Sequence, residues 1–371
     1  MKTALIHDHL AQDGGAEKVL KVMADIFPEA PIYTLLYEKS NADKYFKNRC
    51  IETSIIQKLP GGVKHYQWYM PFMPMAVEFF DLRRYDLVIS DTSSFAKGVI
   101  TTTDTLHICY CHTPTRYLWD YTHQYINELK YNKYLKKIIS LVLNYVRMWD
   151  RQAADRVDVY IANSKAVQKR IRKYYKREST VIYPPVEIEK FHISPQPSDY
   201  FLVGGRLAPY KRIDIVIEAF KRSGKTLKIF GDGVDRLRLE KIAQGFKNIE
   251  FLGRVDDKEK AELYAGCLAF INPQEEDFGI TVVEAMASGR PVIAFARGGA
   301  LETVVKGKTG IFFQKQTSDD IHQAVEDFYK IDWRPLEIRS RAEIFSVEKF
   351  KQAMQEFINA EYEKFFSDRQ N

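Results

Sequence analysis

The sequence predicts an α/β protein of two doubly wound domains that face one another across a cleft. Its 371 residues exceed what one ordinary core needs. Short apolar runs alternate with helical patterns in two successive series, which is typical of parallel sheets. A stretch rich in Pro and Ser, Ser194–Tyr200, separates the two series. We therefore expect a first domain over residues 1–193 and a second over residues 200–345.

The first series opens with a strand-like run at 3–7, a loop with Gly14 and Gly15, and a helical run at 16–27. Further strand-like runs stand at 85–90, 106–110, 157–164 and 179–185, with a helical pattern at 166–175. This alternation predicts strand–helix–strand units.

The second series begins with a strand at 201–205 and a helix at 211–222. Later strands are predicted at 227–231, 249–253, 268–273, 291–296 and 310–313, and apolar residues at helical spacing predict a last helix at 346–366. Ligands of such sheets bind beyond the carboxyl ends of the strands, so the loops that follow the strands are the candidate site.

Composition narrows the class of protein. The net charge of +6 favours anionic ligands or a membrane surface as partners. His7, Asp8 and His9 interrupt the first apolar run, which is not typical of a secretory signal. The run at 138–146 is far shorter than the ~20 residues of a membrane span. The four cysteines form no Cys-x-x-Cys pair, and we expect buried thiols in a reducing cytoplasm.

The stretch from Asn272 to Gly289 joins an apolar strand to an apolar helix, with Gly279 at the corner. Free N–H groups and the positive end of the helix dipole attract an anion such as phosphate there. Glu284 lies one turn further along the same helical face, where it could accept hydrogen bonds from a ribose. Glu276, on the loop before the corner, could bind a second hydroxylated group. This pattern fits a nucleotide sugar, although the two carboxylates alone also fit an ordinary helix acid and a solvated loop acid.

The segment EEDFGITVVEA resembles the Glu-x7-Glu signature of retaining glycosyltransferase family 4, with Glu276 and Glu284 on its two glutamates. DGGAEK resembles the family's Gly-Gly loop, YCHTPTRYLWD its His-bearing segment, and GGRLAPYKRID its Arg/Lys pair. The resemblance covers nearly the whole chain, and it is closest to bacterial O-antigen and exopolysaccharide mannosyltransferases. It implies the GT-B fold of two Rossmann-like domains, with the C-terminal helix over 346–371 returning to the first domain.

The resemblance also assigns roles to single residues. Arg206 and Lys211 would contact the donor diphosphate, His112 would position the transferred sugar, and Glu276 would grip that sugar. The remaining donor-binding residues would be Gly14, Gly15, Gly205, Gly231, Gly233, Gly253, Arg254, Phe278, Gly279, Ile280 and Glu284. Arg116 and Asp120 would line the acceptor side of the pocket.

Two missing patterns exclude other chemistry. Arg236 stands where the third glycine of a G-x-G-x-x-G pattern from Gly231 would be, which argues against a dinucleotide oxidoreductase. The chain contains no Asp-x-Asp, the motif that holds a divalent ion in glycosyltransferases of the other major fold. We therefore expect no metal and no cofactor, with cationic side chains and a helix dipole stabilising the leaving diphosphate.

Two basic, aromatic stretches, Gly61–Phe80 and Lys130–Trp149, suit a surface near anionic lipid. Each alone fits aliphatic core residues and solvated lysines at least as well, and a lipid-linked acceptor favours the lipid surface for the first stretch. With a lipid-linked glycan as acceptor, we expect a cytoplasmic protein that lies on the inner face of the cytoplasmic membrane. No nucleic-acid partner is expected.

Three function classes follow. The leading hypothesis is a retaining glycosyltransferase that moves a hexose, mannose from GDP-mannose, onto a lipid-linked or polysaccharide glycan of the bacterial surface. A transferase of the same family that uses a UDP-sugar is an alternative. From other classes come a nucleotide-sugar epimerase and a non-catalytic binding scaffold. The joint presence of the Gly-Gly loop, His112, Arg206, Lys211, Glu276 and Glu284 argues against the scaffold.

Overall fold

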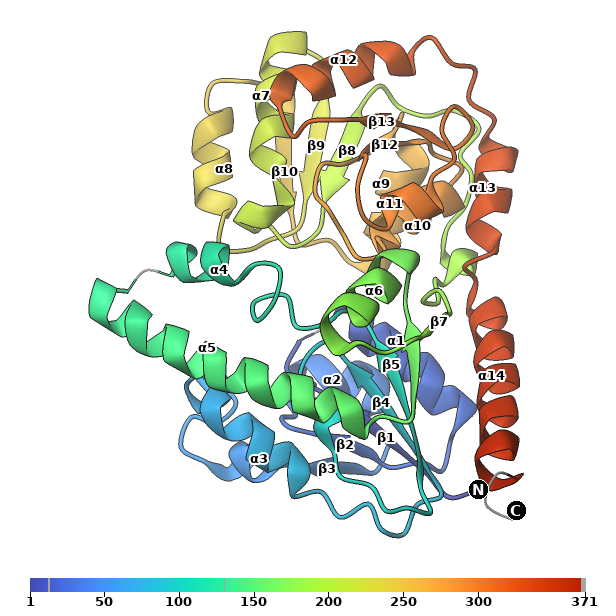
Figure 1. Ribbon diagram of the computed structural model, residues 1–371. Helices are drawn as coiled ribbons and strands as arrows, with labels where there is room; N and C mark the ends of the chain where they lie inside the picture. The colour runs from blue at the N-terminus through green and yellow to red at the C-terminus, as the bar shows by residue number, and fades with distance from the viewer. Residues whose placement is uncertain (13, 130, 368–371) are drawn as a thin grey trace. The chain divides into compact units, whose positions relative to one another are not determined.

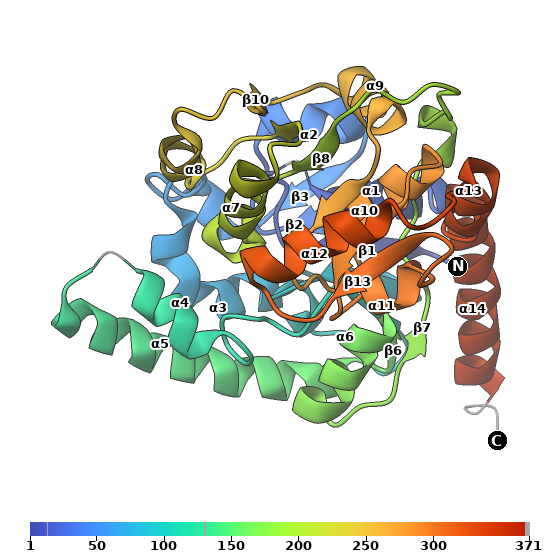
Figure 2. The ribbon, with the colours of Figure 1, turned by 90° about the horizontal axis from the view of Figure 1, so that it is seen from above.

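The computed structural model describes residues 1–12, 14–129 and 131–367, and it divides into two compact units (Figure 1). The first unit holds Met1–Tyr183 and the chain from Phe350 onward, and the second holds Pro184–Lys349. Each unit contains one parallel sheet that is flanked by helices (Figures 1 and 2). The predicted fold class of two doubly wound α/β units is confirmed.

In the described part of the first unit, the seven-stranded sheet has the order β3-β2-β1-β4-β5-β6-β7. The strands are β1 (Thr3–His7), β2 (Ile32–Thr34), β3 (Ile51–Thr53), β4 (Leu87–Thr92), β5 (Leu106–Cys111), β6 (Val159–Ala162) and β7 (Thr180–Val181). The α-helices are α1 (Gly15–Ile26), α2 (Lys39–Phe46), α3 (Met73–Glu78), α4 (Thr122–Glu128), α5 (Lys133–Ala153) and α6 (Lys165–Arg170). Shorter helical turns are η1 (Ile55–Lys58), η2 (Tyr66–Phe72), η3 (Ala96–Gly98), η4 (Ala154–Arg156) and the π-helical η5 (Ile171–Tyr175).

The winding of this sheet reverses between β1 and β4. The two strands pair in parallel, and the register sets His7 opposite Asp91. Chain connections on either side of such a reversal lead away from each other, which leaves the carboxyl ends of β1 and β4 open to a ligand. The reversal therefore marks the first candidate site edge.

The second unit has a sheet of six strands among the described residues, in the order β10-β9-β8-β11-β12-β13. The strands are β8 (Phe201–Gly204), β9 (Leu227–Phe230), β10 (Ile249–Gly253), β11 (Phe270–Asn272), β12 (Val292–Phe295) and β13 (Gly310–Phe313). The helices are η6 (Ile188–Lys190), η7 (Pro209–Lys211), α7 (Ile213–Ser223), α8 (Arg236–Ala243), α9 (Asp257–Gly266), α10 (Ile280–Ala287), α11 (Ala300–Thr303), α12 (Ser318–Phe328) and α13 (Pro335–Glu343). Here the reversal lies between β8 and β11.

The boundary between the units lies earlier than the Pro- and Ser-rich stretch suggested. The first domain was expected to run to residue 193, but the chain joins the second unit at Pro184. The N–H of Val186 donates to Phe345 O at 2.9 Å, and Arg339 Nη1 donates to Phe191 O at 2.7 Å. These bonds to the end of the second unit fix residues 184–193 there, so Ser194–Tyr200 is a loop within that unit.

The last helix, α14 (Val347–Ser367), begins in the second unit and passes into the first. Its Phe350 ring packs edge-on against Tyr110 of β5, with 5.8 Å between the centroids. Phe350, Met354 and Ile358 are buried. The expected return of the C-terminal helix to the first domain is thus observed. Among the described helices, none is both long and apolar enough to cross a membrane.

Helix α5 is fixed to the first unit by a buried ion pair. Lys97 Nζ donates to Asp150 Oδ1 at 2.5 Å, and each side chain is 1% exposed. Burial favours a lower pKa for Lys97, but the Asp150 carboxylate outweighs it, and the pKa of Lys97 is raised. Trp119 Nε1 donates to the other oxygen of Asp150 at 2.8 Å. Because either charge alone would be buried without a partner, this cluster holds the C-terminal half of α5 in place.

Some elements differ from the predicted ones. Strands β2 and β3, each of three residues, were not foreseen because so short a run carries little periodic signal. The helix expected to start at residue 211 starts at Ile213. Arg212 precedes it in the left-handed region, with φ 52°, and Pro209–Lys211 forms a separate 3₁₀ turn. Lys211 therefore lies on a tight loop and not on the helix.

Candidate active site

The corner after β11 has the geometry that the sequence indicated. The loop from Pro273 to Phe278 leads into α10, and Gly279 occupies its N-cap position with φ 92°. A side chain disfavours this left-handed conformation, which explains a glycine at the corner. The carboxyl end of the helix is closed by Gly289, with φ 69°. The first N–H groups of α10 accordingly lie beyond the carboxyl end of β11, beside the strand reversal.

Lys211 and Glu276 form an ion pair at this corner. Lys211 Nζ donates to Glu276 Oε1, and the two side chains are 16% and 18% exposed. Gln274 Nε2 donates to the same oxygen at 2.9 Å. Burial favours a lower pKa for Lys211, but the negative charge of Glu276 outweighs it, so the pKa of Lys211 is raised. We expected Lys211 to contact the donor diphosphate and Glu276 to bind the transferred sugar. The ion pair brings these two residues together.

Arg206 follows Gly205 at the carboxyl end of β8, and β8 is the strand next to β11. Its side chain is exposed, and its positive charge is among the groups that influence the pKa of Lys211. The two predicted diphosphate ligands therefore lie near each other at the reversal of the sheet.

Glu284 is buried, with 3% of the residue exposed, and points from α10 toward α9. Lys260 Nζ donates to Glu284 Oε1 at 2.8 Å, and the Tyr264 hydroxyl donates to Oε2 at 3.4 Å. Burial, followed by the charge of Glu284, raises the pKa of Tyr264 well above its usual value. These two bonds orient the Glu284 carboxylate from α9.

The glycine loops after β8, β9 and β10 lie backbone to backbone. A Cβ atom on Gly231 would come within 1.8 Å of Gly205 O, and one on Gly233 within 2.2 Å of Leu207 O. The N–H of Gly231 donates to Gly253 O at 2.6 Å. Arg254, on the last of these loops, is exposed and lies 3.5 Å from Asp232. Only glycine allows this stacking, and the nucleotide role of these loops stays a prediction.

A further glycine pair supports the corner, although the sequence gave no reason to single it out. The N–H of Gly299 donates to Glu276 O at 2.8 Å. A Cβ atom on Gly298 would come within 2.1 Å of the same oxygen. The loop after β12 thus fixes the backbone of Glu276 from the far side. The adjacent small residues of ARGGA were the signal available in the sequence.

In the first unit, His112 belongs to a row of hydrogen-bonded ionisable side chains at the β1–β4 reversal. His112 Nε2 donates to Asp91 Oδ1 at 2.6 Å, and His7 Nδ1 donates to Asp91 Oδ2 at 2.8 Å. Glu17 Oε1 lies 3.9 Å from His7 Nε2. His112 is 12% exposed and Asp91 only 1%. Asp91 therefore fixes the orientation of the His112 ring from inside the sheet.

The charges of neighbouring side chains determine the protonation of His7 and Asp91. Burial favours a neutral His7, but hydrogen bonds and charges of Asp91 and Glu17 outweigh it and raise the pKa of His7 to about 10. Burial likewise favours a protonated Asp91, yet the two histidines hold the pKa of Asp91 below its usual value. His7 is thus a buried cation between two carboxylates.

Gly14 and Gly15 begin α1 at the same edge. Gly14 is the N-cap residue and Gly15 the first residue of the helix. A Cβ atom on Gly14 would lie 3.0 Å from Glu17 Oε2. The helix that starts at this loop therefore delivers Glu17 to His7. Whether the loop also approaches a donor stays a prediction.

The two predicted acceptor-side residues take part in contacts within the first unit. Asp120 Oδ2 lies 2.8 Å from Arg170 Nε of α6, and Tyr174 donates to Asp120 Oδ1. The Arg116 guanidinium lies over the Tyr121 ring, 5.2 Å from its centroid. Both residues are on the loop between β5 and α4, which also starts with His112.

The sequence missed several residues of these clusters, namely His7, Glu17, Asp91, Lys260, Tyr264 and Gln274. His7 closes β1 and Asp91 lies near the end of β4. Polar residues at the ends of strands were the only available signal. This signal becomes informative only when the strand order is known, because β1 then lies beside β4.

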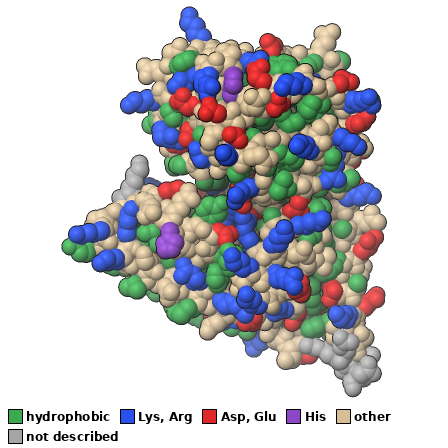
Figure 3. Space-filling model, turned by 45° about the horizontal axis from the view of Figure 1, so that its top comes forward, with side chains coloured by type: hydrophobic (Ala, Val, Ile, Leu, Met, Phe, Trp, Pro, Cys, Tyr) green, Lys and Arg blue, Asp and Glu red, His purple; other side chains and the backbone are tan. Residues whose placement is uncertain are grey.

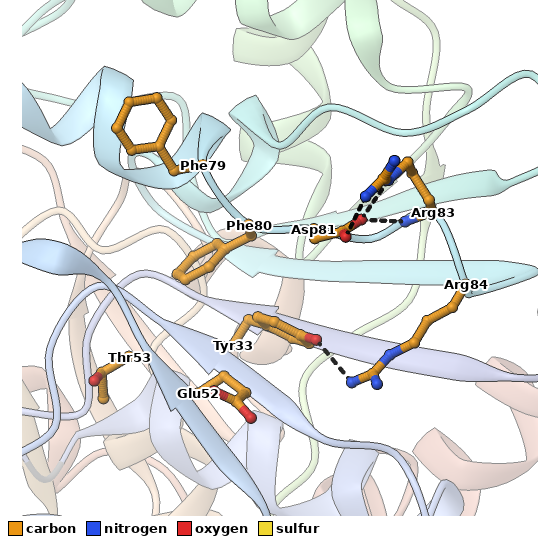
Figure 4. A pocket seen from close by; sticks show the side chains of 8 residues that line it. All are labelled: Tyr33, Glu52, Thr53, Phe79, Phe80, Asp81, Arg83 and Arg84. Carbon is orange, nitrogen blue, oxygen red and sulfur yellow. Dashed lines mark hydrogen bonds and ion pairs between the residues drawn. The ribbon is translucent and has the colours of Figure 1, made fainter.

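A separate hollow lies elsewhere in the first unit (Figure 4). It has a volume of about 660 Å³ and is lined by Tyr33, Glu52, Thr53, Phe79, Phe80, Asp81, Arg83 and Arg84. Arg84 Nη2 donates to the Tyr33 hydroxyl at 3.3 Å, and Arg83 pairs with Asp81 at 2.7 Å. None of the predicted site residues lines it. In the described part of the chain, no three His, Cys, Asp or Glu side chains are grouped so as to hold a metal ion.

Solved structures define the class of the fold. The Anabaena protein HepE, crystallised in complex with UDP, matches 97% of this chain and 100% of its own, with a TM-score of 0.71 and 20% identity. Sucrose-phosphate synthase from Thermosynechococcus elongatus matches 98% and 100%, with a TM-score of 0.74 and 16% identity. These likenesses show that the two units have the Rossmann-like folds of GT-B glycosyltransferases.

Curated relatives resemble parts of the chain. The GDP-mannose-dependent alpha-mannosyltransferase of Mycolicibacterium smegmatis is 32% identical over 175 residues, which are 44% of this chain and 46% of that protein. The alpha-1,3/1,6-mannosyltransferase ALG2 of Dictyostelium discoideum is 26% identical over 288 residues, 65% and 66% of the two chains. The matches span about half to two thirds of these relatives' length.

Two family models identify the family. The model for Glycosyltransferase Family 4 matches residues 13–190, and the model for Glycosyl transferases group 1 matches residues 186–344. Together they run from residue 13 to residue 344 and place the chain among the family 4 glycosyltransferases.

The buried cation predicts a specific pH dependence of stability. Replacing His7 by Gln leaves Asp91 and Glu17 without their shared cation and should cost on the order of 3–5 kcal/mol near pH 6. Because the pKa of His7 is raised from 6.5 to about 10 in the folded state, its stabilisation is complete below about pH 6.5 and is lost as the pH rises through 10. Urea unfolding of both proteins from pH 6 to pH 10 measures this difference.

The matched control is His192→Gln, because His192 is exposed and lies 3.7 Å from an exposed Glu262. It should change the unfolding free energy by less than ~0.5 kcal/mol. A His7→Gln difference that stays constant up to pH 10 would contradict a charged His7.

Proposed function

We propose that the protein is a retaining, metal-independent glycosyltransferase that moves mannose from GDP-mannose onto a lipid-linked glycan of the bacterial surface. The observation that carries the proposal is the corner after β11. There the start of α10 lies between Glu276 and Glu284, and Lys211 is held on Glu276. This arrangement offers one anion site flanked by two hydroxyl acceptors.

In the proposed reaction, Arg206, Lys211 and the N-terminus of α10 stabilise the diphosphate as it leaves. Fixed charges aimed at developing charge lower a barrier most when they are already in position. The diphosphate would draw Lys211 away from Glu276. The same oxygen of Glu276, to which Gln274 also donates, would then accept a hydroxyl of the transferred sugar. Donor binding and sugar recognition are thus coupled through one lysine.

Glu284 would hold the ribose of the nucleotide. Lys260 and Tyr264 fix its carboxylate from α9, and ribose hydroxyls would donate to its oxygens. This division gives each carboxylate a different part of the donor. The glycine loops after β8, β9 and β10 would surround the rest of the nucleotide.

His112 would position the transferred sugar, because Asp91 fixes its ring. We assign no protein nucleophile. The acceptor hydroxyl would attack the face that the diphosphate leaves, and a phosphate oxygen would take its proton. This keeps the anomeric configuration and needs no covalent intermediate.

The choice of mannose as the sugar and guanine as the base is supported by the named relatives, one of which is GDP-mannose-dependent. A UDP-sugar is the second candidate, because a solved protein of the same fold was crystallised in complex with UDP. The proposed location is the inner face of the cytoplasmic membrane, where a lipid-linked acceptor is accessible.

The first test is transfer itself. With GDP-mannose and a lipid-linked glycan extract, the protein should release GDP and form a product with the donor's anomeric configuration, with or without EDTA. UDP-sugars are run in parallel, and product is analysed by mass spectrometry and NMR. Loss of activity in EDTA that Mg²⁺ or Mn²⁺ restores would overturn metal independence. Conversion of the donor without any acceptor would favour an epimerase.

A second test concerns the diphosphate. Arg206→Ala should lower turnover by roughly a hundredfold to a thousandfold with an unchanged fold, since Arg206 is exposed and its charge acts on the leaving group. The matched control is Arg222→Ala, which removes an exposed arginine paired with Asp319. Equal turnover in the two variants would remove Arg206 from the site.

A third test distinguishes the role of Glu276 from that of Glu284. Glu276→Gln should leave the affinity for free nucleoside diphosphate unchanged or tighter, because Lys211 is released, and lower turnover by about a hundredfold through a misplaced sugar. Glu284→Gln should weaken binding of the nucleotide and of the intact donor alike, by roughly tenfold or more. Calorimetry with both ligands and transfer rates give the two readouts.

Lys260→Gln is the control for Glu284, because it breaks the ion pair and keeps the carboxylate. If Glu276→Gln loses nucleoside diphosphate as strongly as Glu284→Gln does, the carboxylates do not divide the donor in this way.

A further inference from the structure

Helix α5 carries an apolar stripe that no described part of the first unit covers. Tyr134, Ile138, Leu141, Tyr145 and Met148 follow helical spacing and are between 49% and 72% exposed. The helix packs into the hydrophobic core of the first unit through other residues, namely Leu143, Val146, Trp149 and Ala153. The stripe is therefore not required by the core.

A second exposed stripe lies on the neighbouring segment η2–α3. It consists of Trp68 and Phe72 on the 3₁₀ turn η2, Met75 on α3 and Phe79 directly after α3, which are between 44% and 72% exposed. The buried side of α3 shares one hydrophobic cluster with the buried side of α5. Both helices accordingly cover the same face of the sheet (Figures 1 and 2). The segment η2 lies against α5.

We call the exposed residues of these two stripes, with Lys64, Lys133 and Lys137, the α3–α5 face. Monomeric proteins rarely expose so many large apolar side chains on adjacent elements, and such surfaces mark sites of interaction. In the space-filling view, basic and hydrophobic side chains lie together over the part at the left that α4 and α5 form (Figure 3).

The charge on this face has one sign. Lys64, Lys133 and Lys137 are exposed. The sequence has no Asp or Glu from Ser54 to Val77 or from Tyr131 to Trp149. The two acids beside Phe79, Glu78 and Asp81, pair with Arg156 and Arg83. Lys133 is the first residue of α5, where the helix dipole disfavours positive charge. Its placement costs helix stability, which an external anionic partner would compensate.

We propose that the α3–α5 face docks onto an anionic membrane surface. Tyr, Trp and aliphatic side chains beside lysines are the composition of interfacial helices. An anionic bilayer offers both an apolar layer and negative headgroups. A second copy of the chain fits less well, because the same face would oppose its own lysines with no acid to pair them.

The face also has a suitable place in the fold. Helix α4 and α5 follow the loop that starts with His112 at the carboxyl edge of β5, and η2 follows β3 from the same edge. Docking would bring this edge to the lipid surface, where a lipid-linked acceptor lies. That consequence rests on the proposed function, whereas vesicle binding itself does not.

The experiment is co-sedimentation of the full chain with vesicles, without donor or acceptor. The protein should bind vesicles of equimolar phosphatidylcholine and phosphatidylglycerol, bind phosphatidylcholine alone far more weakly, and dissociate as salt is raised. Ile138→Gln with Leu141→Gln should lower the partition coefficient by about tenfold or more. Lys133→Glu with Lys137→Glu should lower it on anionic vesicles only.

The matched control is Leu237→Gln with Leu336→Gln, which removes two leucines that are 82% and 77% exposed on the second unit. It should bind vesicles like the unchanged protein. All three double variants should keep the melting temperature, because the substituted side chains are exposed.

Two outcomes would overturn the proposal. One is a protein that ignores anionic vesicles, or whose Ile138/Leu141 variant binds as well as the control. The other is a dimer in sedimentation velocity that this same variant dissociates, which would assign the face to self-association. Transfer to a water-soluble acceptor, measured in parallel, keeps this result separate from the proposed function, since it should be equal in all variants.

Discussion

The reversal of strand order at the centre of each sheet is the constraint on which the candidate site depends. In the first unit β1 and β4 lie side by side, and in the second β8 and β11 do. The connections on either side lead away from these pairs, so their carboxyl ends are left uncovered. The predicted donor-binding residues of the second unit lie at the carboxyl ends of its strands, on the loops that follow them, or in the first turns of α10. His112 and Asp91 occupy the equivalent edge of the first unit.

Charge pairing prepares both edges in the same manner. Lys211 is held on Glu276, Lys260 on Glu284, and His112 on Asp91. Each pair couples a group assigned to substrate with a hydrogen-bonding partner, and in the two lysine pairs that partner has the opposite charge. Low exposure strengthens these pairs and makes an uncompensated member costly. A charged ligand such as a diphosphate would therefore compete with these partners for the paired side chains, since none of them is an isolated ion.

Outside these edges, the first unit has one surface whose chemistry its own folding does not explain. The buried ion pair of Lys97 and Asp150 and the shared hydrophobic cluster hold α5 firmly at its C-terminal half. The stripe on the other side of the helix adds nothing to that core. Exposing apolar groups to water is unfavourable, and contact with a partner would remove that cost.

The sequence by itself determined the fold class, most strands, and the corner from Glu276 to Glu284. Hydrophobic periodicity and the position of Gly279 are local properties, and they can be recognised along the chain. The tertiary structure decided the rest. His7 and Asp91 are 84 positions apart, and Lys211 and Glu276 are 65 apart. Only strand order and register bring such residues together, and no local pattern encodes either. The same holds for the unit boundary at Pro184 and for the exposure of the α5 stripe, because burial of a helical face depends on which elements pack against it.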